Sequence, residues 1–279
     1  MVGRAGAVRP CGPLSPARAA RAPMELRPVC HSGRMHSPDP LLMTAADHDD
    51  GDTGAGRRAR LAVSRLYVCT DLQRFLRPDG TLDTAAFAHF CAAAFRGGVD
   101  LIQVRDKAVD VAVELAAFAV LVPLAREHGA LSAANDRADV AALAGVDVFH
   151  TGQTDLTTAQ CRALLGPNVV LGRSCHTEAQ VRAARAEDGL DYFCTGPVWA
   201  TPTKPGRAAV GLELPSHAAR LDAEDPAGAR PWFAIGGVDA ERLPEVRAAG
   251  ADRIVVVRAV MQAEDPEAAA RTLRAGLPG

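Results

Sequence analysis

Residues 99–149 read VDLIQVRDKAVDVAVELAAFAVLVPLAREHGALSAANDRADVAALAGVDVF. Short aliphatic and β-branched runs at 99–104, 131–134 and 146–149 alternate here with alanine-rich segments near 109–128 and 137–144. The short runs predict strands and the longer segments predict helices. Strands that alternate regularly with helices are typical of a parallel sheet built from β-α units.

The same rhythm extends from Leu61 to the end of the chain. Further strands are predicted at about 65–70, 169–172, 191–194, 232–235 and 253–257, and further helices near 83–96, 157–165, 177–188, 211–221, 239–249 and 266–275. Candidate N-caps are Asp83, Thr157, Thr177 and Asp239, and candidate helix ends are Gly129, Gly145 and Gly166. Eight β-α units in roughly 215 residues predict an α/β fold of the (β/α)8 TIM barrel type. An open doubly wound sheet is the alternative, but its glycine-rich first turn, G-x-G-x-x-G, is missing.

Residues 1–60 differ in composition from the rest of the chain. They are rich in Ala, Arg, Pro and Gly, and Glu25 is the one acidic residue before Pro38. The arginines superficially resemble an organelle transit peptide, but this composition favours a disordered tail or a start codon assigned too far upstream. We therefore predict a disordered or mis-annotated extension at 1–60 and a single catalytic barrel at 61–279.

Composition limits the classes of partner. The chain has 279 residues, 48% hydrophobic residues and a formal net charge of -2, so a sizeable core is expected and a nucleic-acid or acidic-membrane footprint is not. No apolar run approaches the ~18 residues of a membrane span. The seven cysteines are scattered without a C-x-x-C pair, which favours reduced thiols and a cytoplasmic location.

Polar side chains follow the predicted strand at 99–104. Alternation places Gln103, Arg105 and Lys107 on the same face as the apolar residues before them. Active sites of (β/α)8 barrels lie at the carboxyl ends of the strands, so an anion site is predicted there. The alternative is a solvated strand end, where charges are common.

Two carboxylates follow the next two strands. Asn135 and Asp136 come after the strand at 131–134, and Asp155 ends the segment H-T-G-Q-T-D that begins at His150. Each aspartate alone would most often be a helix cap or a turn residue. Together on adjacent loops they predict a Mg²⁺ site, because magnesium is usually held by one or two carboxylates plus substrate phosphates.

Later strand ends carry further polar and glycine residues. The segment L-G-R-S-C-H-T places Ser174 and Cys175 at the rim, although Cys175 is not expected to act as a nucleophile. Gly236 and Gly237 follow the strand at 232–235 and predict a second anion pocket, for which a tight turn is the plainer alternative. The loop within 194–211 carries hydroxyls and a lysine at Thr201, Thr203 and Lys204, which suit phosphate.

In order and spacing, these motifs resemble the thiamine phosphate synthase family. The matching pieces are Q-V-R-D-K at 103–107, N-D at 135–136, H-T-G-Q-T-D at 150–155, L-G-R-S-C-H-T at 171–177, G-P-V-W-A-T-P-T-K at 196–204 and I-G-G-V at 235–238. The resemblance covers about 65–262 and leaves the first 60 residues unexplained.

The resemblance implies a transferase that couples 4-amino-5-hydroxymethyl-2-methylpyrimidine diphosphate with a thiazole phosphate, giving thiamine phosphate and pyrophosphate with Mg²⁺ as cofactor. By the family pattern the pyrimidine diphosphate would be held by Gln103, Val104, Arg105, Asp106, Lys107, Asn135, Ser174 and Lys204. The metal would be bound by Asp136 and Asp155. The thiazole phosphate would be held by Thr201, Pro202, Thr203, Gly237, Val257 and Arg258.

Loss of pyrophosphate would precede attack by the thiazole nitrogen. The expected catalytic residues are Arg105, Lys107, Ser174 and Lys204. Many members of the family have serine where Arg258 stands, which puts the thiazole phosphate contact at this position in question. The resemblance also implies a small homo-oligomer.

Two other functions remain compatible with these motifs. A thiazole tautomerase has a similar fold but no need for the two-carboxylate metal site. A non-catalytic barrel that binds a phosphorylated ligand would keep the anion pockets and would show no magnesium-dependent product.

Overall fold

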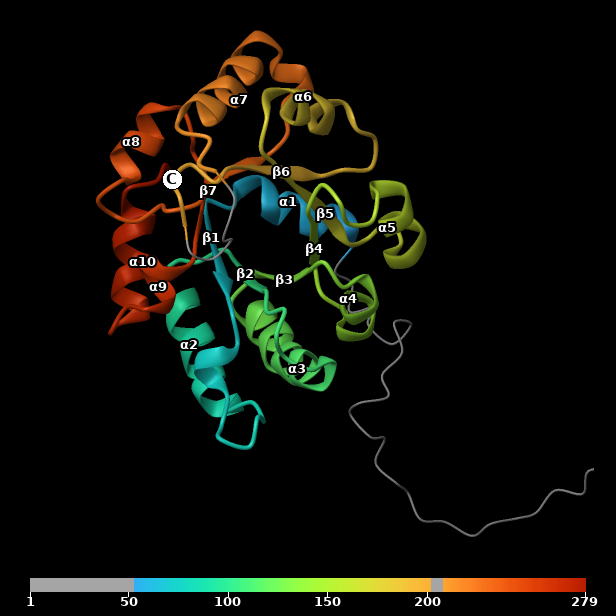
Figure 1. The fold of residues 1–279 in the computed structure, drawn as a ribbon, viewed down its shortest axis with the longest axis vertical. Helices are drawn as coiled ribbons and strands as arrows, with labels where there is room; N and C mark the ends of the chain where they lie inside the picture. The colour runs from blue at the N-terminus through green and yellow to red at the C-terminus, as the bar shows by residue number, and fades with distance from the viewer. Residues whose placement is uncertain (1–52, 202–207) are drawn as a thin grey trace, which may run out of the picture. The chain divides into compact units, whose positions relative to one another are not determined.

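The computed structural model describes residues 53–201 and 208–279. The strands are β1 Leu66–Thr70, β2 Leu101–Val104, β3 Leu131–Asn135, β4 Val148–Thr151, β5 Val170–Cys175, β6 Tyr192–Thr195, β7 Trp232–Ile235 and β8 Ile254–Val256. Neighbouring strands pair in parallel, and β8 pairs with β1, so the sheet closes into a barrel. Figure 1 shows the strands at the centre with the helices around them. The predicted (β/α)8 barrel is therefore confirmed.

The helices lie outside the sheet, and most of them form a layer around it. They are α1 Gly54–Val63, α2 Thr84–Arg96, α3 Val111–Glu127, α4 Ala138–Ala144, α5 Thr158–Leu165, α6 Glu178–Ala186, α7 Glu213–Glu224, α8 Leu243–Ala248, α9 Arg258–Met261 and α10 Pro266–Ala275, with short 3-10 turns at Gln73–Phe75 and Pro226–Gly228. Asp83, Thr157 and Thr177 cap α2, α5 and α6 with side-chain hydrogen bonds, as predicted. Among the described helices, none has the length and apolar character of a membrane span.

Two differences from the predicted elements occur near the C-terminus. Asp239 accepts a hydrogen bond from the Arg242 N–H at 2.9 Å, but it caps a turn, and α8 begins only at Leu243. After β8, the chain forms the four-residue helix α9, which periodicity cannot reveal because it is a single turn.

Alternation along the strands divides the apolar side chains between two cores. One core lies between the sheet and the outer helices and includes Ile102, Val104 and Phe193. The other fills the barrel lumen, where the rings of Tyr67 and Tyr192 both pack edge-on against Phe233, with centroid distances of 5.5 and 5.8 Å. These aromatic rings fill the lumen below the polar residues at the carboxyl ends of the strands.

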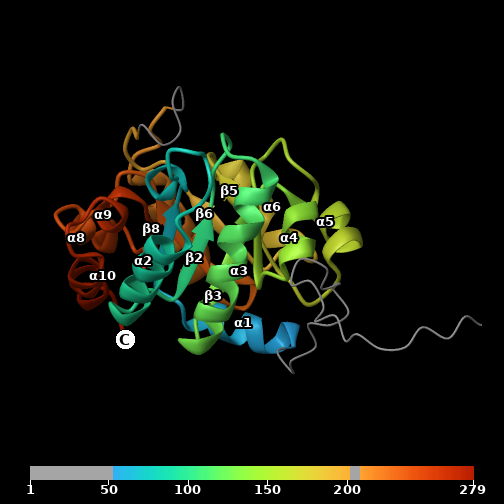
Figure 2. The ribbon, with the colours of Figure 1, turned by 90° about the horizontal axis from the view of Figure 1, so that it is seen from below.

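Helix α1 corrects the predicted boundary at residue 61. Figure 2 shows this helix lying across one end of the barrel. Arg57 pairs with Asp147 at 3.1 Å and Arg58 with Asp191 at 2.6 Å, and both aspartates directly precede a strand. Leu61 is 1% exposed and belongs to the lumen core. Residues 54–60 are thus part of the barrel, and the expected extension is shorter; its residues 1–52 lie outside the described part.

Candidate active site

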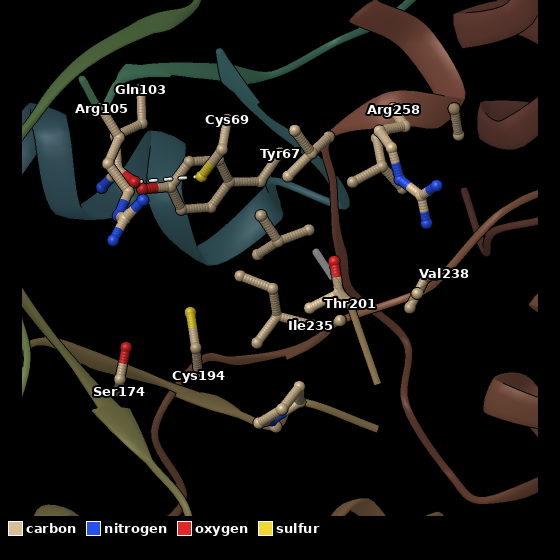
Figure 3. Close-up of a pocket in the computed structure, with 18 of the residues that line it drawn as sticks. Tyr67, Cys69, Gln103, Arg105, Ser174, Cys194, Thr201, Ile235, Val238 and Arg258 are labelled. Atoms are coloured by element: carbon tan, nitrogen blue, oxygen red, sulfur yellow. Dashed lines mark hydrogen bonds between the residues drawn. The ribbon is translucent and has the colours of Figure 1, made fainter. Parts of the chain in front are cut away.

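A cavity of about 300 Å³ opens at the carboxyl ends of the strands, and a wider one of about 710 Å³ adjoins it. Both are lined by Cys69, Arg105, Asn135, Ser174, Val257 and Arg258, so they form one continuous mouth. In Figure 3, Arg105 and Ser174 lie toward one end of the first cavity, and Arg258 and Val238 lie toward the other. The side chains predicted from separate motifs therefore meet in one place.

Gln103 and Arg105 project into the mouth from β2 and the loop after it, as alternation predicted. Gln103 is 2% exposed, and its Oε1 accepts a hydrogen bond from the Cys69 thiol at 3.0 Å, drawn in Figure 3. Its Nε2 is a buried donor without a hydrogen-bond partner among the described residues. Buried amide donors are nearly always satisfied, so this atom is suited to a polar ligand.

Two carboxyl groups and a lysine meet in the wider cavity. Lys107 Nζ lies 2.6 Å from Asp136 Oδ2, and the Asp155 side chain is within hydrogen-bonding range of the same carboxyl group. Burial would raise the pKa of Asp136, but hydrogen bonding to Lys107 and Asp155 and the charge of Arg105 outweigh it and lower that pKa. The ionised form that could bind a cation is therefore favoured.

Local backbone geometry fixes both carboxylates. Asp136 has a φ of 61°, a left-handed conformation that few residues other than glycine adopt. Its N–H donates to the His150 carbonyl at 3.1 Å, which ties the loop after β3 to β4. Asp155 Oδ2 accepts from the Gly152 N–H at 2.6 Å within the next loop. Asp136 is thus fixed in the loop after β3 and Asp155 in the loop after β4, as the sequence predicted.

The Ser174 hydroxyl lies 2.9 Å from His150 Nε2, beneath the rim of β5. The Ser174 carbonyl accepts from Gln153 Nε2 at 2.6 Å, which fixes the strand end against the loop after β4. Both Ser174 and His150 are buried among the described residues, yet both line the mouth. A serine held in this way can offer one directed hydrogen bond to a ligand.

The opposite side of the mouth is formed by backbone. Gly236 and Gly237 have φ angles of 100° and 72°. A Cβ atom on Gly236 would lie 2.5 Å from Pro197 Cβ, and one on Gly237 would lie 2.8 Å from Trp199 Cβ. Glycine is therefore required at both positions for conformation and for space, and the close approach leaves the turn's backbone facing the cavity.

The family model described as "Thiamine monophosphate synthase" matches residues 67–260, which run from the second residue of β1 into α9. The chain belongs to this family.

Similar curated proteins of the thiamine monophosphate synthase family agree with this assignment. A thiamine-phosphate synthase of Arthrobacter sp. is 50% identical over 237 residues, which are 79% of this chain and 97% of that protein. One of Streptomyces avermitilis is 52% identical over 213 residues, covering 76% and 93%. One of Mycobacterium tuberculosis is 50% identical over 228 residues, covering 78% and 97%.

Solved structures show the same barrel. Thiamine phosphate pyrophosphorylase from Pyrococcus furiosus superposes with a TM-score of 0.63 at 29% identity, covering 78% of this chain and 96% of that one. A 3-hexulose-6-phosphate synthase superposes with a TM-score of 0.53 at 21% identity, covering 77% and 100%. The second likeness concerns the fold alone.

Two residues expected from the family pattern turn their side chains to other partners. The Val104 side chain is 1% exposed in the outer core, because alternation turns it away from the lumen, so only its backbone could face a substrate. Asp106 lines the wider cavity, but its carboxylate accepts from the Leu72 N–H and the Ala108 N–H at 3.0 and 2.9 Å and so joins two loops. Pro202, Thr203 and Lys204 lie outside the described residues.

Cys175 is a buried residue of the outer core and does not face the mouth. Its side chain is fully buried among outer-core residues, and burial raises the pKa of its thiol to about 12. A thiol in that environment is not ionised near neutral pH. This agrees with the expectation that it is not a nucleophile.

Tyr67, Cys69 and Cys194 line the mouth and were not predicted from the sequence. The alternation of side chains along β1 and β6 could have predicted all three. Tyr67 and Cys69 are two residues apart on β1, as are Tyr192 and Cys194 on β6, so each pair faces the lumen. They were not predicted because their side chains are typical of a core and carry no charge that would indicate a site.

Proposed function

We propose that the protein joins 4-amino-5-hydroxymethyl-2-methylpyrimidine diphosphate to a thiazole phosphate, giving thiamine phosphate and pyrophosphate. One observation carries the proposal. Cationic Arg105 and Lys107, with two carboxyl groups in contact, lie on one side of a mouth whose other side is the glycine turn at 236–237. A reaction between two phosphorylated substrates needs two anion sites that face a shared space.

We assign a Mg²⁺ site to Asp136 and Asp155. Two carboxyl groups in contact repel each other when both are ionised, unless a cation or a proton lies between them. In the described ranges, no group of three or more His, Cys, Asp and Glu side chains could hold a metal ion. Two carboxylates with phosphate oxygens are a usual magnesium environment, so the pair fits this ion and requires the diphosphate to complete it. When bound there, Mg²⁺ supplies charge stabilisation to the departing pyrophosphate.

Arg105 and Lys107 act on the same leaving group. The bond between the pyrimidine methylene carbon and the diphosphate oxygen breaks, and both electrons leave with the diphosphate. The cation that remains is stabilised by the electron-rich aminopyrimidine. Preorganised positive charge beside the developing anion is worth several kcal/mol in a water-poor site. Lys107, which is already paired with Asp136, also sets where the diphosphate lies relative to the carboxylates.

The thiazole nitrogen then donates its lone pair to the methylene carbon. We propose that the backbone at Gly237 and at the turn of Val257 and Arg258 holds the thiazole phosphate, with Thr201 beside it. By the family pattern, Pro202 and Thr203 would join them at the thiazole phosphate, and Lys204 would act on the pyrimidine diphosphate. The Arg258 guanidinium, in a position where serine is common, adds a cation to this phosphate pocket.

The carboxyl pair distinguishes this function from the alternatives. A tautomerase or a non-catalytic phosphate-binding barrel would need no second carboxylate at Asp155 in contact with Asp136. The thiols of Cys91, Cys161 and Cys175 are buried and form no disulfide with any described cysteine, which supports our proposal of a cytoplasmic location. A small homo-oligomer also remains a proposal.

The test is a coupling assay on the full-length protein. Both phosphorylated precursors are supplied with and without Mg²⁺, and thiamine phosphate and pyrophosphate are followed together. Equal, magnesium-dependent release of both products is expected. The full chain is required, because a fragment that starts at residue 61 lacks Arg57 and Arg58, which anchor α1. Thiazole isomerisation without coupling would instead favour the tautomerase.

A further inference from the structure

A chain of buried hydroxyl and imidazole groups leads from the active-site rim to the barrel floor. Ser174 Oγ lies 2.9 Å from His150 Nε2, and His150 Nδ1 lies 3.0 Å from the Tyr192 hydroxyl. The Tyr192 hydroxyl is in turn 3.5 Å from that of Tyr67. All four side chains are buried, and Tyr192 lines neither cavity. Tyr192 can therefore influence a ligand only through its neighbours.

Gly172 allows this row of hydrogen-bonded side chains to form. In the strand register Gly172 pairs with His150 on one side and with Tyr192 on the other. A Cβ atom at Gly172 would lie 2.1 Å from the Tyr192 ring. The missing side chain leaves a gap in the lumen layer, and the Tyr192 ring fills it. The phenol thereby passes across β5 and reaches the imidazole on β4.

The order of donors along this chain decides what Ser174 offers to a ligand. A neutral imidazole has one donor and one acceptor nitrogen. If Tyr192 donates to Nδ1, the proton lies on Nε2, Ser174 Oγ accepts it, and the serine proton is free to point into the mouth. If the order is reversed, Ser174 donates to Nε2 and can only accept from the ligand.

The geometry favours the first order. In the reversed order, Nδ1–H donates to Tyr192, and Tyr192 must donate across 3.5 Å to Tyr67, at the outer limit of a hydrogen bond. In the first order, Tyr192 donates over 3.0 Å to Nδ1. Burial raises the pKa of both phenols far above the usual value, so each keeps its proton. A phenol is also the more acidic of the two hydroxyls that face the imidazole.

We propose that His150 is a positioning residue, held by Tyr192 in its Nε2–H form, which turns the Ser174 hydroxyl proton into the mouth. Ser174 then acts as a donor, and its partner is an acceptor atom of the pyrimidine diphosphate, either a ring nitrogen or a phosphate oxygen. The identity of that partner rests on the function proposed above. The order of donors within the protein does not.

The first test needs no substrate. In protein with ¹⁵N-labelled histidine, nitrogen and carbon chemical shifts report the tautomer of each imidazole, and His150→Gln identifies the resonances of His150. The Nε2–H form is expected to predominate in the native protein. In Tyr192→Phe, the proportion of the Nδ1–H form is expected to rise. An Nδ1–H form in the native protein would overturn the proposal.

The second test is a double-mutant cycle on kcat/KM for the pyrimidine diphosphate. Tyr192→Phe keeps the buried ring and is expected to lower kcat/KM about three- to tenfold, the size of one directed hydrogen bond. In a Ser174→Ala background, the same change is expected to have almost no effect, because Tyr192 acts through the serine. Equal losses in both backgrounds would show a general structural role and refute the proposal.

The two tests separate the inference from the function. If the native protein does not couple the two precursors, the proposed function fails, and the tautomer of His150 still decides the order of donors. If coupling occurs and the cycle is additive, only the positioning role fails.

Discussion

The pair of Arg57 and Asp147 holds α1 on the barrel, and its removal gives a sharp prediction for stability. The two side chains are 9% and 11% exposed, and their closest charged atoms are 3.1 Å apart. Removing one partner of a buried ion pair costs about 3–5 kcal/mol, because the other charge stays buried. Asp147 would keep hydrogen bonds from the N–H and the hydroxyl of Ser132, at 2.9 and 2.8 Å. We therefore expect Arg57→Met to lower the free energy of unfolding by about 2–3 kcal/mol.

The neighbouring Arg58 supplies a matched control. Its side chain is 37% exposed, and its partner Asp191 is also bound by Arg162 at 2.6 Å. Arg58→Met is therefore expected to cost below about 1 kcal/mol. Urea unfolding of the full-length variants, followed by circular dichroism, measures both values. Adding Asp147→Asn to Arg57→Met should recover part of the loss. Equal losses for the two arginine variants would refute the larger contribution assigned to the buried pair of Arg57 and Asp147.

Four further predictions concern the site. Asp136→Asn is expected to raise the Mg²⁺ concentration for half-maximal coupling at least about tenfold while leaving the urea midpoint nearly unchanged; an unaltered magnesium titration would remove this carboxylate from the metal site. Lys107→Met removes the ammonium group that lowers the pKa of Asp136, so that pKa rises and the acid limb of the kcat/KM profile should shift to higher pH; a shift to lower pH would contradict this role of the ammonium group. Arg258→Ala should raise the KM for the thiazole phosphate and not that for the pyrimidine diphosphate, and the reverse pattern would place Arg258 at the other substrate. Cys175→Ala should keep kcat within about twofold, and a loss beyond about a hundredfold in a folded variant would restore the thiol as a candidate nucleophile.

The alternation of side chains along the strands and the order of the strands were enough to predict several residues of the site. Gln103 and Arg105 were assigned to one face because they follow Leu101 at intervals of two, and Leu101 lies in the lumen core. Asp136 and Asp155 were placed together because consecutive parallel strands bring their loops side by side. These inferences needed only local periodicity and the closure of the barrel, which the chain shares with other (β/α)8 proteins.

Features that depend on distant contacts could not be predicted. Helix α1 has an arginine-rich sequence typical of a tail, and its ion pairs with Asp147 and Asp191 depend on residues far away in the sequence. The role of Gly172 depends on Tyr192, which lies across the register on another strand. Val104 was included with its neighbours from the family pattern, although alternation alone turns it outward.

The contacts of α1 also constrain the order of events on the ribosome. Gly54 donates to Asn168, 114 residues later, and Arg58 pairs with Asp191, 133 residues later. Arg253 also donates to the Ala62 carbonyl at 2.8 Å, 191 residues later. At synthesis rates of about 5–20 residues per second, the helix waits roughly 10–38 seconds before Arg253, the latest of these partners, has been made. An isolated helix of ten residues is only marginally stable in water. The segment synthesised first in the barrel is therefore among the last to dock completely, because Arg253 directly precedes β8 and seven of the eight strands are made before it.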